Sequence, residues 1–177
     1  MQYRRSDIKG ASYFFSVNLN NRKTRLLVDY IEALRSSIIH VKQRHPFTID
    51  AIVVMPEHLH AVFTLPHNDN NYAMRWMLIK SVFSRKIPKK ETISPSRASK
   101  RERGIWQRRY WEHLIRDEHD YQSHIDYIHY NPVKHGHASS PVDWPYSSIH
   151  QYIKNGELPK NWGDDDNDRK NNRGERR

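Results

Sequence analysis

The chain has 177 residues, and its 30 lysines and arginines outnumber its 20 aspartates and glutamates, giving a formal net charge of +10. This length suits one domain, and the charge favours a polyanionic partner, although it could serve solubility alone. The absence of cysteine excludes disulfides, thiolate zinc sites and cysteine nucleophiles. Without a membrane-spanning run or an export-type apolar segment, the sequence predicts a cytoplasmic protein that does not enter the membrane.

The first part of the chain alternates between strand and helix patterns. Residues 13–19 are apolar at every second position, which predicts a strand. In residues 24–45 the apolar positions recur in steps of three and four, which predicts a helix that Pro46 ends. Two β-rich runs, 47–55 and 58–65, follow with only two residues between them and predict an antiparallel hairpin.

A second amphipathic helix is predicted after a polar loop at residues 67–71. Its apolar residues recur at helical spacing among basic ones: Met74, Met77, Leu78, Val82 and Phe83. Residues 88–104 are polar and basic with few large apolar side chains, which predicts a flexible loop. Composition leaves open whether this loop is a plain connector or contacts a polyanion.

The last predicted elements are a strand and a third helix. The latter half of residues 105–115 is expected to form the strand, Asp117 can cap the helix, and Pro132 is expected to end it. The order of elements predicts an α+β fold of the ferredoxin-like split βαβ type, an antiparallel sheet with helices on one face and an additional C-terminal helix. The domain is expected to span residues 1–162, with Trp144 and Trp162 docked on it. Residues 163–177 are charged and are expected to be disordered.

Two histidines in the second arm of the hairpin are a candidate metal site. Strand alternation places His58 and His60 on one face, and two neutral imidazoles at this spacing can bind a metal ion. The opposite face is apolar and should be buried: Leu59, Ala61, Phe63 and Leu65. With twelve histidines in the chain, about one such pair is expected by chance. The second pair, His135 and His137, lies in a polar, glycine-containing stretch and is interpreted as incidental.

The third predicted helix carries a possible nucleophile. Its core side is expected to hold Tyr121, Ile125 and Ile128. Its other side is expected to hold Asp120, His124, Tyr127 and Asn131. A phenol has a pKa of about 10, so it becomes a nucleophile only with help in losing its proton and in neutralising charge. A divalent cation supplies the second kind of help, whereas an isolated tyrosine is more often a packed surface residue.

Several segments taken together resemble a known family. The first is residues 56–60, with the His58 and His60 pair, and the second is residues 126–136, with Tyr127 and Asn131. Supporting segments are residues 3–5, 106–113 and 143–148. The combination resembles the HUH single-tyrosine transposases, most closely the REP-associated tyrosine transposases, over roughly residues 1–162. One departure is the stretch 88–103, which is longer than such proteins need between helix and strand.

The resemblance implies a specific chemistry and site. His58 and His60 would be paired metal ligands, Asn131 a third ligand and Tyr127, on a catalytic helix, the nucleophile. The implied enzyme cleaves and rejoins single-stranded DNA at REP-like hairpin palindromes through a 5′-phosphotyrosine. It would use Mg²⁺ or Mn²⁺, because two imidazoles and an amide leave room for water and phosphate oxygens, and no nucleotide cofactor.

DNA affinity is expected from basic side chains that bind phosphates: Arg4, Arg5, Lys9, Arg75, Lys80, Arg108 and Arg109. Three alternatives stay open. Ferredoxin-like sheets also serve as noncatalytic RNA or DNA binders, a metal-dependent nuclease could use water instead of the tyrosine, and the histidine pair could be structural. The resemblance favours a monomer bound to the nucleoid, with a dimer left open because related insertion-sequence transposases pair.

Overall fold

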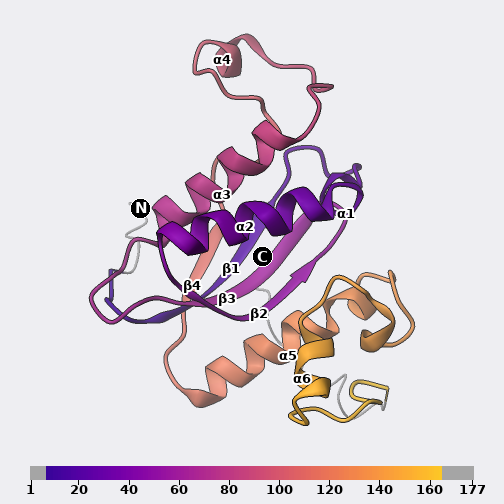
Figure 1. The fold of residues 1–177 in the computed structure, drawn as a ribbon. Helices are drawn as coiled ribbons and strands as arrows, with labels where there is room; N and C mark the ends of the chain where they lie inside the picture. The colour runs from indigo at the N-terminus through magenta and orange to yellow at the C-terminus, as the bar shows by residue number, and fades with distance from the viewer. Residues whose placement is uncertain (1–6, 165–177) are drawn as a thin grey trace, which may run out of the picture.

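Residues 7–164 of the computed structural model form an antiparallel sheet with helices on both faces (Figure 1). This described part of the chain holds four strands in the order β2-β3-β1-β4. The strands are β1 (Ser12–Asn18), β2 (Thr48–Val54), β3 (His58–Thr64) and β4 (Trp111–Leu114). The helices are α1 (Leu26–Asp29), α2 (Ile31–Arg44), α3 (Tyr72–Lys86), α4 (Pro95–Ala98), α5 (Glu118–Lys134), α6 (Ile149–Lys154) and the 3₁₀ helix η1 (Pro141–Asp143). The predicted α+β class and split βαβ order are confirmed.

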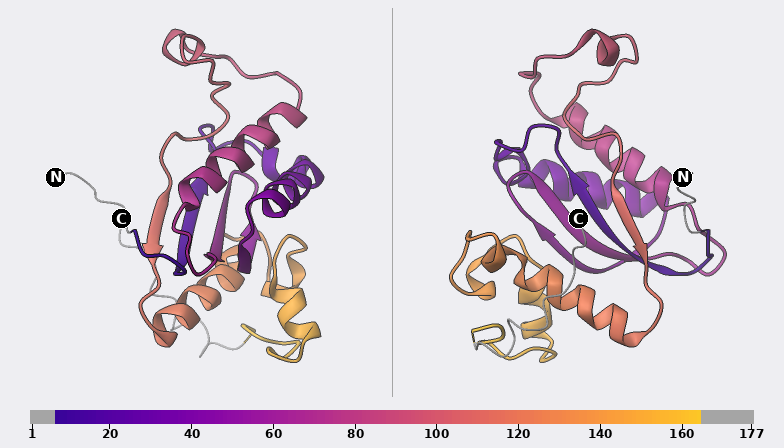
Figure 2. Two further views of the ribbon diagram at one scale, coloured as in Figure 1. Left: turned by 60° about the vertical axis from the view of Figure 1, so that its left-hand side comes forward. Right: turned by 180° about the vertical axis from the view of Figure 1, so that it is seen from behind.

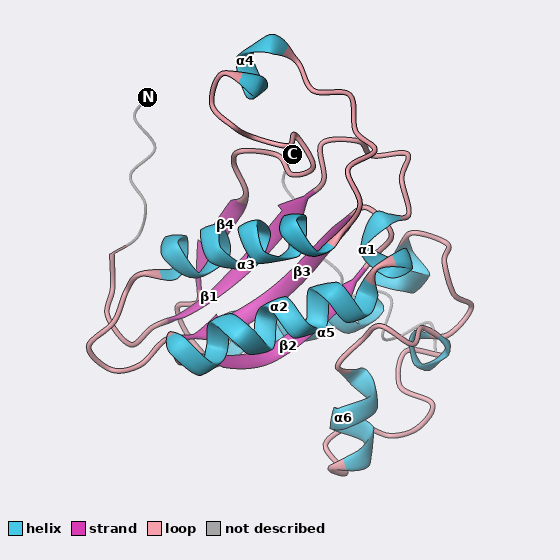
Figure 3. Ribbon diagram, turned by 45° about the horizontal axis from the view of Figure 1, so that its top comes forward, coloured by secondary structure: helices cyan, strands magenta, loops and turns pink. Residues whose placement is uncertain are grey.

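The first core lies between the sheet and the helices α2 and α3, which pack side by side (Figure 3). Odd-numbered residues of β1 and β3 point into this core because successive side chains of a strand face opposite sides. Phe63 stacks on Trp76 of α3 with ring centroids 4.8 Å apart. The predicted burial of Leu59, Ala61, Phe63 and Leu65 is confirmed, and each such side chain contributes roughly 1.5–3 kcal/mol.

The second core lies on the opposite face of the sheet, under α5 (Figure 2). Phe14, Val53 and Val62 point from the strands toward Ile125 and Ile128 of the helix. β3 is therefore buried on both faces, and its even-numbered residues face α5. This arrangement turns the side of the sheet that carries the histidine pair toward the helix that carries the predicted nucleophile.

Two predicted helix boundaries are wrong. The first helix is broken at Tyr30, whose φ of −115° and ψ of 37° are not helical, so it forms α1 and α2. Pro132 does not end the third helix, which runs to Lys134. A turn after Lys134 terminates the helix: Gly136 has a φ of +71°, which suits glycine, and the backbone N–H of His137 donates to the Pro132 carbonyl at 2.8 Å.

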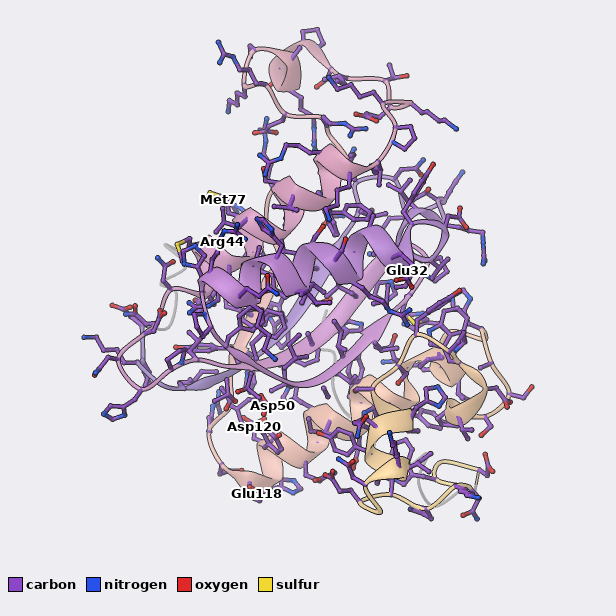
Figure 4. All side chains as sticks on the ribbon, viewed as in Figure 1. Glu32, Arg44, Asp50, Met77, Glu118 and Asp120 are labelled. Atoms are coloured by element: carbon purple, nitrogen blue, oxygen red, sulfur yellow. The ribbon has the colours of Figure 1, made fainter. Side chains whose placement is uncertain are left out.

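The second predicted helix and the loop after it differ from expectation in detail. Met77 belongs to the predicted apolar stripe of α3, yet it is 59% exposed and points away from the sheet (Figure 4), because Trp76 and Ile79 fill the core instead. The basic segment 88–104 projects beyond the end of α3 and contains the short helix α4. Arg103 fastens it by donating to the carbonyls of Ile87 and Pro88 at 2.9 and 2.7 Å.

The segment after α5 docks on the domain. Trp144 donates from Nε1 to the Val54 carbonyl at 2.9 Å, and Trp162 lies 6.0 Å from the ring of His129, as expected for both tryptophans. Gly163, the first residue of the predicted tail, is buried, whereas residues 165–177 lie outside the described part. Within residues 7–164, no helix combines the length and the apolar character of a membrane span.

Candidate active site

The structure brings the predicted nucleophile and the histidine pair together from β3 and α5. His58 and His60 project from β3 toward α5, and their ring centroids are 4.9 Å apart. Tyr127 projects back from the middle of α5, and its ring centroid lies 5.1 Å from that of His60. Tyr127 is 2% exposed and His60 is 1% exposed, so both side chains are enclosed between sheet and helix. One chain supplies all three residues.

Burial keeps both imidazoles neutral. It lowers the pKa of His58, and it lowers the pKa of His60 well below the usual range, because a charged His60 would also be repelled by His58 and His135 in their protonated forms. A neutral imidazole has a free lone pair, which is the form that binds a metal ion.

Glu57 determines which nitrogen of His58 is free. Nδ1 of His58 lies 2.8 Å from Oε1 of Glu57, and a carboxylate only accepts, so Nδ1 carries the proton and donates. The lone pair of His58 is thereby left on Nε2. Arg22 lies 3.5 Å from Oε1 of the same carboxylate. Such carboxylate–histidine pairs orient metal ligands in many proteins.

The donor set fits a divalent cation. Both ring nitrogens of His60 and both amide atoms of Asn131 are buried and have no hydrogen-bond partner among the described residues. Unpaired buried polar atoms are costly, and a cation held by imidazole nitrogens and an amide oxygen would satisfy one ring nitrogen of His60 and the amide oxygen of Asn131. Asn131 lies one helical turn after Tyr127, as expected from the spacing, and is fully buried.

Phe14 of β1 packs between the groups of the site. Its ring centroid lies 5.5 Å from that of His60, 5.8 Å from that of Tyr127 and 4.7 Å from that of His124. Because Phe14 is itself buried, it limits the rotations available to the two catalytic candidates. The period-two pattern of β1 predicts its direction, but not this contact.

Two residues near the end of the segment 126–136 lie at the site and were given no role from the sequence. Nζ of Lys134 lies 4.6 Å from the centroid of the Tyr127 ring, and the ring of His135 lies 5.3 Å from that of His58. The interpretation of His135 as incidental is therefore wrong. The available signal was the spacing, because Lys134 and His135 follow Tyr127 by seven and eight residues, about two helical turns. His137 instead packs near Trp144, 5.4 Å between ring centroids.

The burial of Ile125 and Ile128, predicted for the core side of α5, is confirmed. Tyr127 and Asn131, predicted for its other side, are buried as well. Tyr127 belongs to the same core as the two isoleucines.

A second cluster of possible metal ligands lies where α5 begins, beside β4. His113, Asp120 and His124 have ligand atoms within 4.8 Å of one another, and Asp120 accepts from Nε2 of His113 at 2.8 Å. Burial alone would raise the pKa of Asp120, but the hydrogen bonds from His113 and from the backbone of Arg116 lower it. Figure 4 labels Asp120 near the first turn of α5. The spacing predicted that Asp120 and His124 share one side of the helix, but it did not predict that His113 of β4 joins them.

One of the predicted phosphate contacts is wrong. Arg75 is 1% exposed, and its guanidinium donates to Asp69 and to the carbonyls of His45, Pro46 and Asn71. Arg75 joins α3 to the end of α2. Because its N–H groups donate to partners within the protein, they are not available to a phosphate.

The other predicted phosphate contacts differ in accessibility. Lys80 donates to the Gln107 carbonyl at 3.1 Å, and burial lowers its pKa to about 8. Lys9, Arg108 and Arg109 are exposed, and Arg108 forms an ion pair with Glu102. The predictions for Arg4 and Arg5 fall outside the described residues.

Comparison with known proteins identifies the family. The family model described as IS200-like transposase matches residues 8–131. The REP-associated tyrosine transposase of Escherichia coli K12 is 43% identical over 93% of this chain and 92% of its own length. A Haemophilus influenzae Rd protein assigned to the same group is 46% identical over 91% and 92%.

A solved structure of a REP-associated tyrosine transposase bound to a REP hairpin matches with a TM-score of 0.80 and 42% identity. The match covers 93% of this chain and 92% of the other. The chain therefore belongs to the IS200-like transposases and, within them, to the REP-associated tyrosine transposases. The resemblance inferred from the sequence is confirmed, and the protein is an enzyme of this class.

Proposed function

We propose that the protein cleaves and rejoins single-stranded DNA beside REP-like hairpins, with Tyr127 as the nucleophile. The observation that carries the proposal is the distance of 5.1 Å between the rings of Tyr127 and His60, contributed by α5 and β3 of one chain. The relative solved with a REP hairpin supports hairpin DNA as the substrate class. The net charge of +10 favours binding to such a polyanion.

His58, His60 and Asn131 are the residues that would hold a divalent cation, Mg²⁺ or Mn²⁺. When bound, the cation would polarise the scissile phosphate and neutralise charge that develops on its oxygens. The oxygen-preferring ions suit a site with few protein ligands. No nucleotide cofactor is needed, because the covalent bond to the tyrosine conserves the energy of the phosphodiester.

The covalent step exchanges one phosphoester bond for another. Oη of Tyr127 loses its proton and attacks the phosphorus, the bond from phosphorus to the 3′ oxygen breaks, and the 3′ oxygen takes up a proton. The products are a 5′-phosphotyrosine and a free 3′-hydroxyl, and attack by a 3′-hydroxyl reverses the step. The ammonium of Lys134, 4.6 Å from the Tyr127 ring centroid, stabilises negative charge on the phenol oxygen.

Because Tyr127 and His60 are enclosed, a DNA phosphate can reach them only if neighbouring side chains move. Lys134 and His135 are exposed side chains that lie against Tyr127 and His58. Rotation of these two side chains toward solvent opens the way for a phosphate, and Lys134 can then contact that phosphate directly. Because one chain supplies nucleophile and ligands, we propose that the active unit is a monomer, bound to the nucleoid of the cytoplasm.

The test is covalent capture of DNA. A labelled REP-like hairpin with its single-stranded flank is incubated with the protein and Mn²⁺ or Mg²⁺, and the products are separated on a denaturing gel. The proposal predicts a protein–DNA adduct that Tyr127→Phe abolishes while binding is retained. Free cleaved DNA from both proteins would indicate a nuclease that uses water, and binding without cleavage would indicate a noncatalytic hairpin binder.

A further inference from the structure

A basic groove lies between α3 and the segment 97–110, away from the catalytic residues. Its volume is about 830 Å³, and it is lined by six basic side chains and one acidic side chain. The basic residues are Lys80, Arg85, Arg97, Arg101, Arg103 and Arg108. The C-terminal part of the segment 88–104 forms one wall of this groove.

Two of these arginines stabilise the segment that lines the groove through hydrogen bonds within the protein. Arg97 donates to the carbonyl of Trp106 at 3.3 Å and to the side chain of Asn20 at 3.1 Å. Arg103 donates to Glu91 and to backbone carbonyls at the end of α3. Their hydrogen bonds hold the segment in a fixed shape over α3, which gives the groove a defined form.

Two other arginines face solvent at the groove. Arg85 and Arg101 are exposed, and within residues 7–164 neither forms an ion pair. Their charge is available to an anionic ligand. The remaining lining includes Met77, which is more than half exposed, and Tyr110, which is half-buried, whereas Trp106 is only 8% exposed.

The groove and the catalytic site lie at the same end of the sheet on opposite faces, because α3 covers one face and α5 the other. Leu19 directly follows β1 and forms an isolated antiparallel β-bridge with Trp106. The backbone N–H of Leu19 donates to the Glu57 carbonyl at 2.8 Å. Neighbouring strands are about 4.8 Å apart, so Trp106 is two strand spacings, roughly 10 Å, from the strand that carries His58. Arg22, about half exposed beside Glu57, adds positive charge between the two places.

We propose that this groove binds the single-stranded DNA that flanks the scissile phosphate. Exposed arginines suit phosphates, and apolar and aromatic surface suits unpaired bases, which is the combination that single-strand binding sites use. The volume of the groove, about 830 Å³, is in the range of sites that admit one small ligand. The proposal rests on the proposed function, since it describes how the DNA of that same site continues.

The test compares DNA hairpins that differ only in their flank. Fluorescence anisotropy measures the dissociation constants for a REP-like hairpin with a short 5′ single strand, with a short 3′ single strand and without either. Arg101→Gly removes the charge, and because Arg101 has a φ of +55°, glycine suits its backbone and keeps the fold. Met77→Glu places a negative charge in the groove. Lys154→Glu, exposed on α6, is the control for the change in net charge.

We expect both groove variants to weaken binding of one flanked hairpin and to leave the hairpin without a flank unchanged. The slope of log affinity against log salt should fall by about 0.7 in Arg101→Gly, because one phosphate is no longer neutralised. Equal weakening on all three DNAs, unchanged binding by both groove variants, or the same weakening in Lys154→Glu would overturn the proposal. The covalent adduct at Tyr127 is scored separately on the denaturing gel, so failure of the catalytic proposal is distinguishable from failure of this one.

Discussion

Nδ1 of His58 donates to the carboxylate of Glu57 across 2.8 Å, so a residue adjacent in sequence determines which nitrogen of this ring is free. The contact forms because Glu57 lies at the turn between β2 and β3, directly before the strand begins. The carboxylate also lies 3.5 Å from Arg22 at the end of β1. The geometry makes Glu57 a positioning residue for the predicted metal site.

Removal of this carboxylate should weaken metal binding without unfolding the protein. We expect Glu57→Ala to lower Mn²⁺ affinity by about 10–100-fold, and Glu57→Gln, which keeps an acceptor oxygen, to lower it less. Isothermal titration calorimetry with Mn²⁺ measures the effect, and Glu32→Ala, at an exposed position of α2, is the control. An unchanged affinity of Glu57→Ala would show that the orientation of His58 does not depend on this contact.

Asn131 is expected to lower the stability of the metal-free protein and to be needed for metal binding. Its buried amide has no hydrogen-bond partner among residues 7–164, so in the metal-free protein Asn131→Leu should raise the free energy of unfolding by about 1–3 kcal/mol. The same variant should lose the extra stability that Mn²⁺ gives to the wild type. Urea unfolding with EDTA and with Mn²⁺ measures both effects. A variant that is destabilised in EDTA and still stabilised by Mn²⁺ would exclude Asn131 as a ligand.

Stability should fall with acid because His129 is buried in the neutral form. Burial, with a smaller effect of His150, lowers the pKa of His129 from 6.5 to about 3. The unfolded chain therefore takes up a proton near pH 6.5 that the folded protein accepts only near pH 3. The contribution of His129 to the free energy of unfolding is constant above pH 6.5, and below pH 6.5 it declines by about 1.4 kcal/mol per pH unit.

The variant His129→Gln tests this pH dependence, because glutamine can still bond to the Ser148 hydroxyl that His129 contacts at 2.9 Å. Its unfolding free energy, measured in urea at several values between pH 6.5 and 4.5, should decline less steeply than that of the wild type. His119→Gln, at an exposed position on the same helix, should keep the wild-type slope. Equal slopes in all three proteins would mean that His129 takes up its proton without unfolding.

The sequence predicted the sheet and the catalytic candidates because their signals are local. Strand alternation placed His58 and His60 on one face, and helical spacing placed Tyr127 and Asn131 one turn apart. The burial of Arg75 could not be predicted, because it depends on carbonyls from another helix end. The contact between His135 and His58 likewise depends on how α5 crosses the sheet, a tertiary arrangement that periodicity does not specify.

The ion pair between Glu91 and Arg103 should determine how firmly the segment 88–104 is held. The hydrogen bond from Arg103 lowers the pKa of Glu91 from 4.5 to about 2, so its stabilisation is complete above pH 4.5 and is lost as the pH falls through about 2. At neutral pH, Glu91→Gln removes the charge but keeps an acceptor. We expect amide hydrogen exchange in this segment to become about tenfold faster, since hydrogen bonds to charged groups contribute roughly 1.5–3 kcal/mol.

The control for this change is Glu102→Gln, which removes the partner of Arg108 at the more exposed side of the groove. Exposed ion pairs contribute only about 0–1 kcal/mol, so exchange in residues 88–104 should stay close to that of the wild type. If Glu91→Gln behaves like the control, the backbone carbonyls that Arg103 contacts, those of Ser84, Ile87 and Pro88, are sufficient to hold it. The groove wall would then depend on backbone geometry rather than on charge, and it would keep its shape in acid.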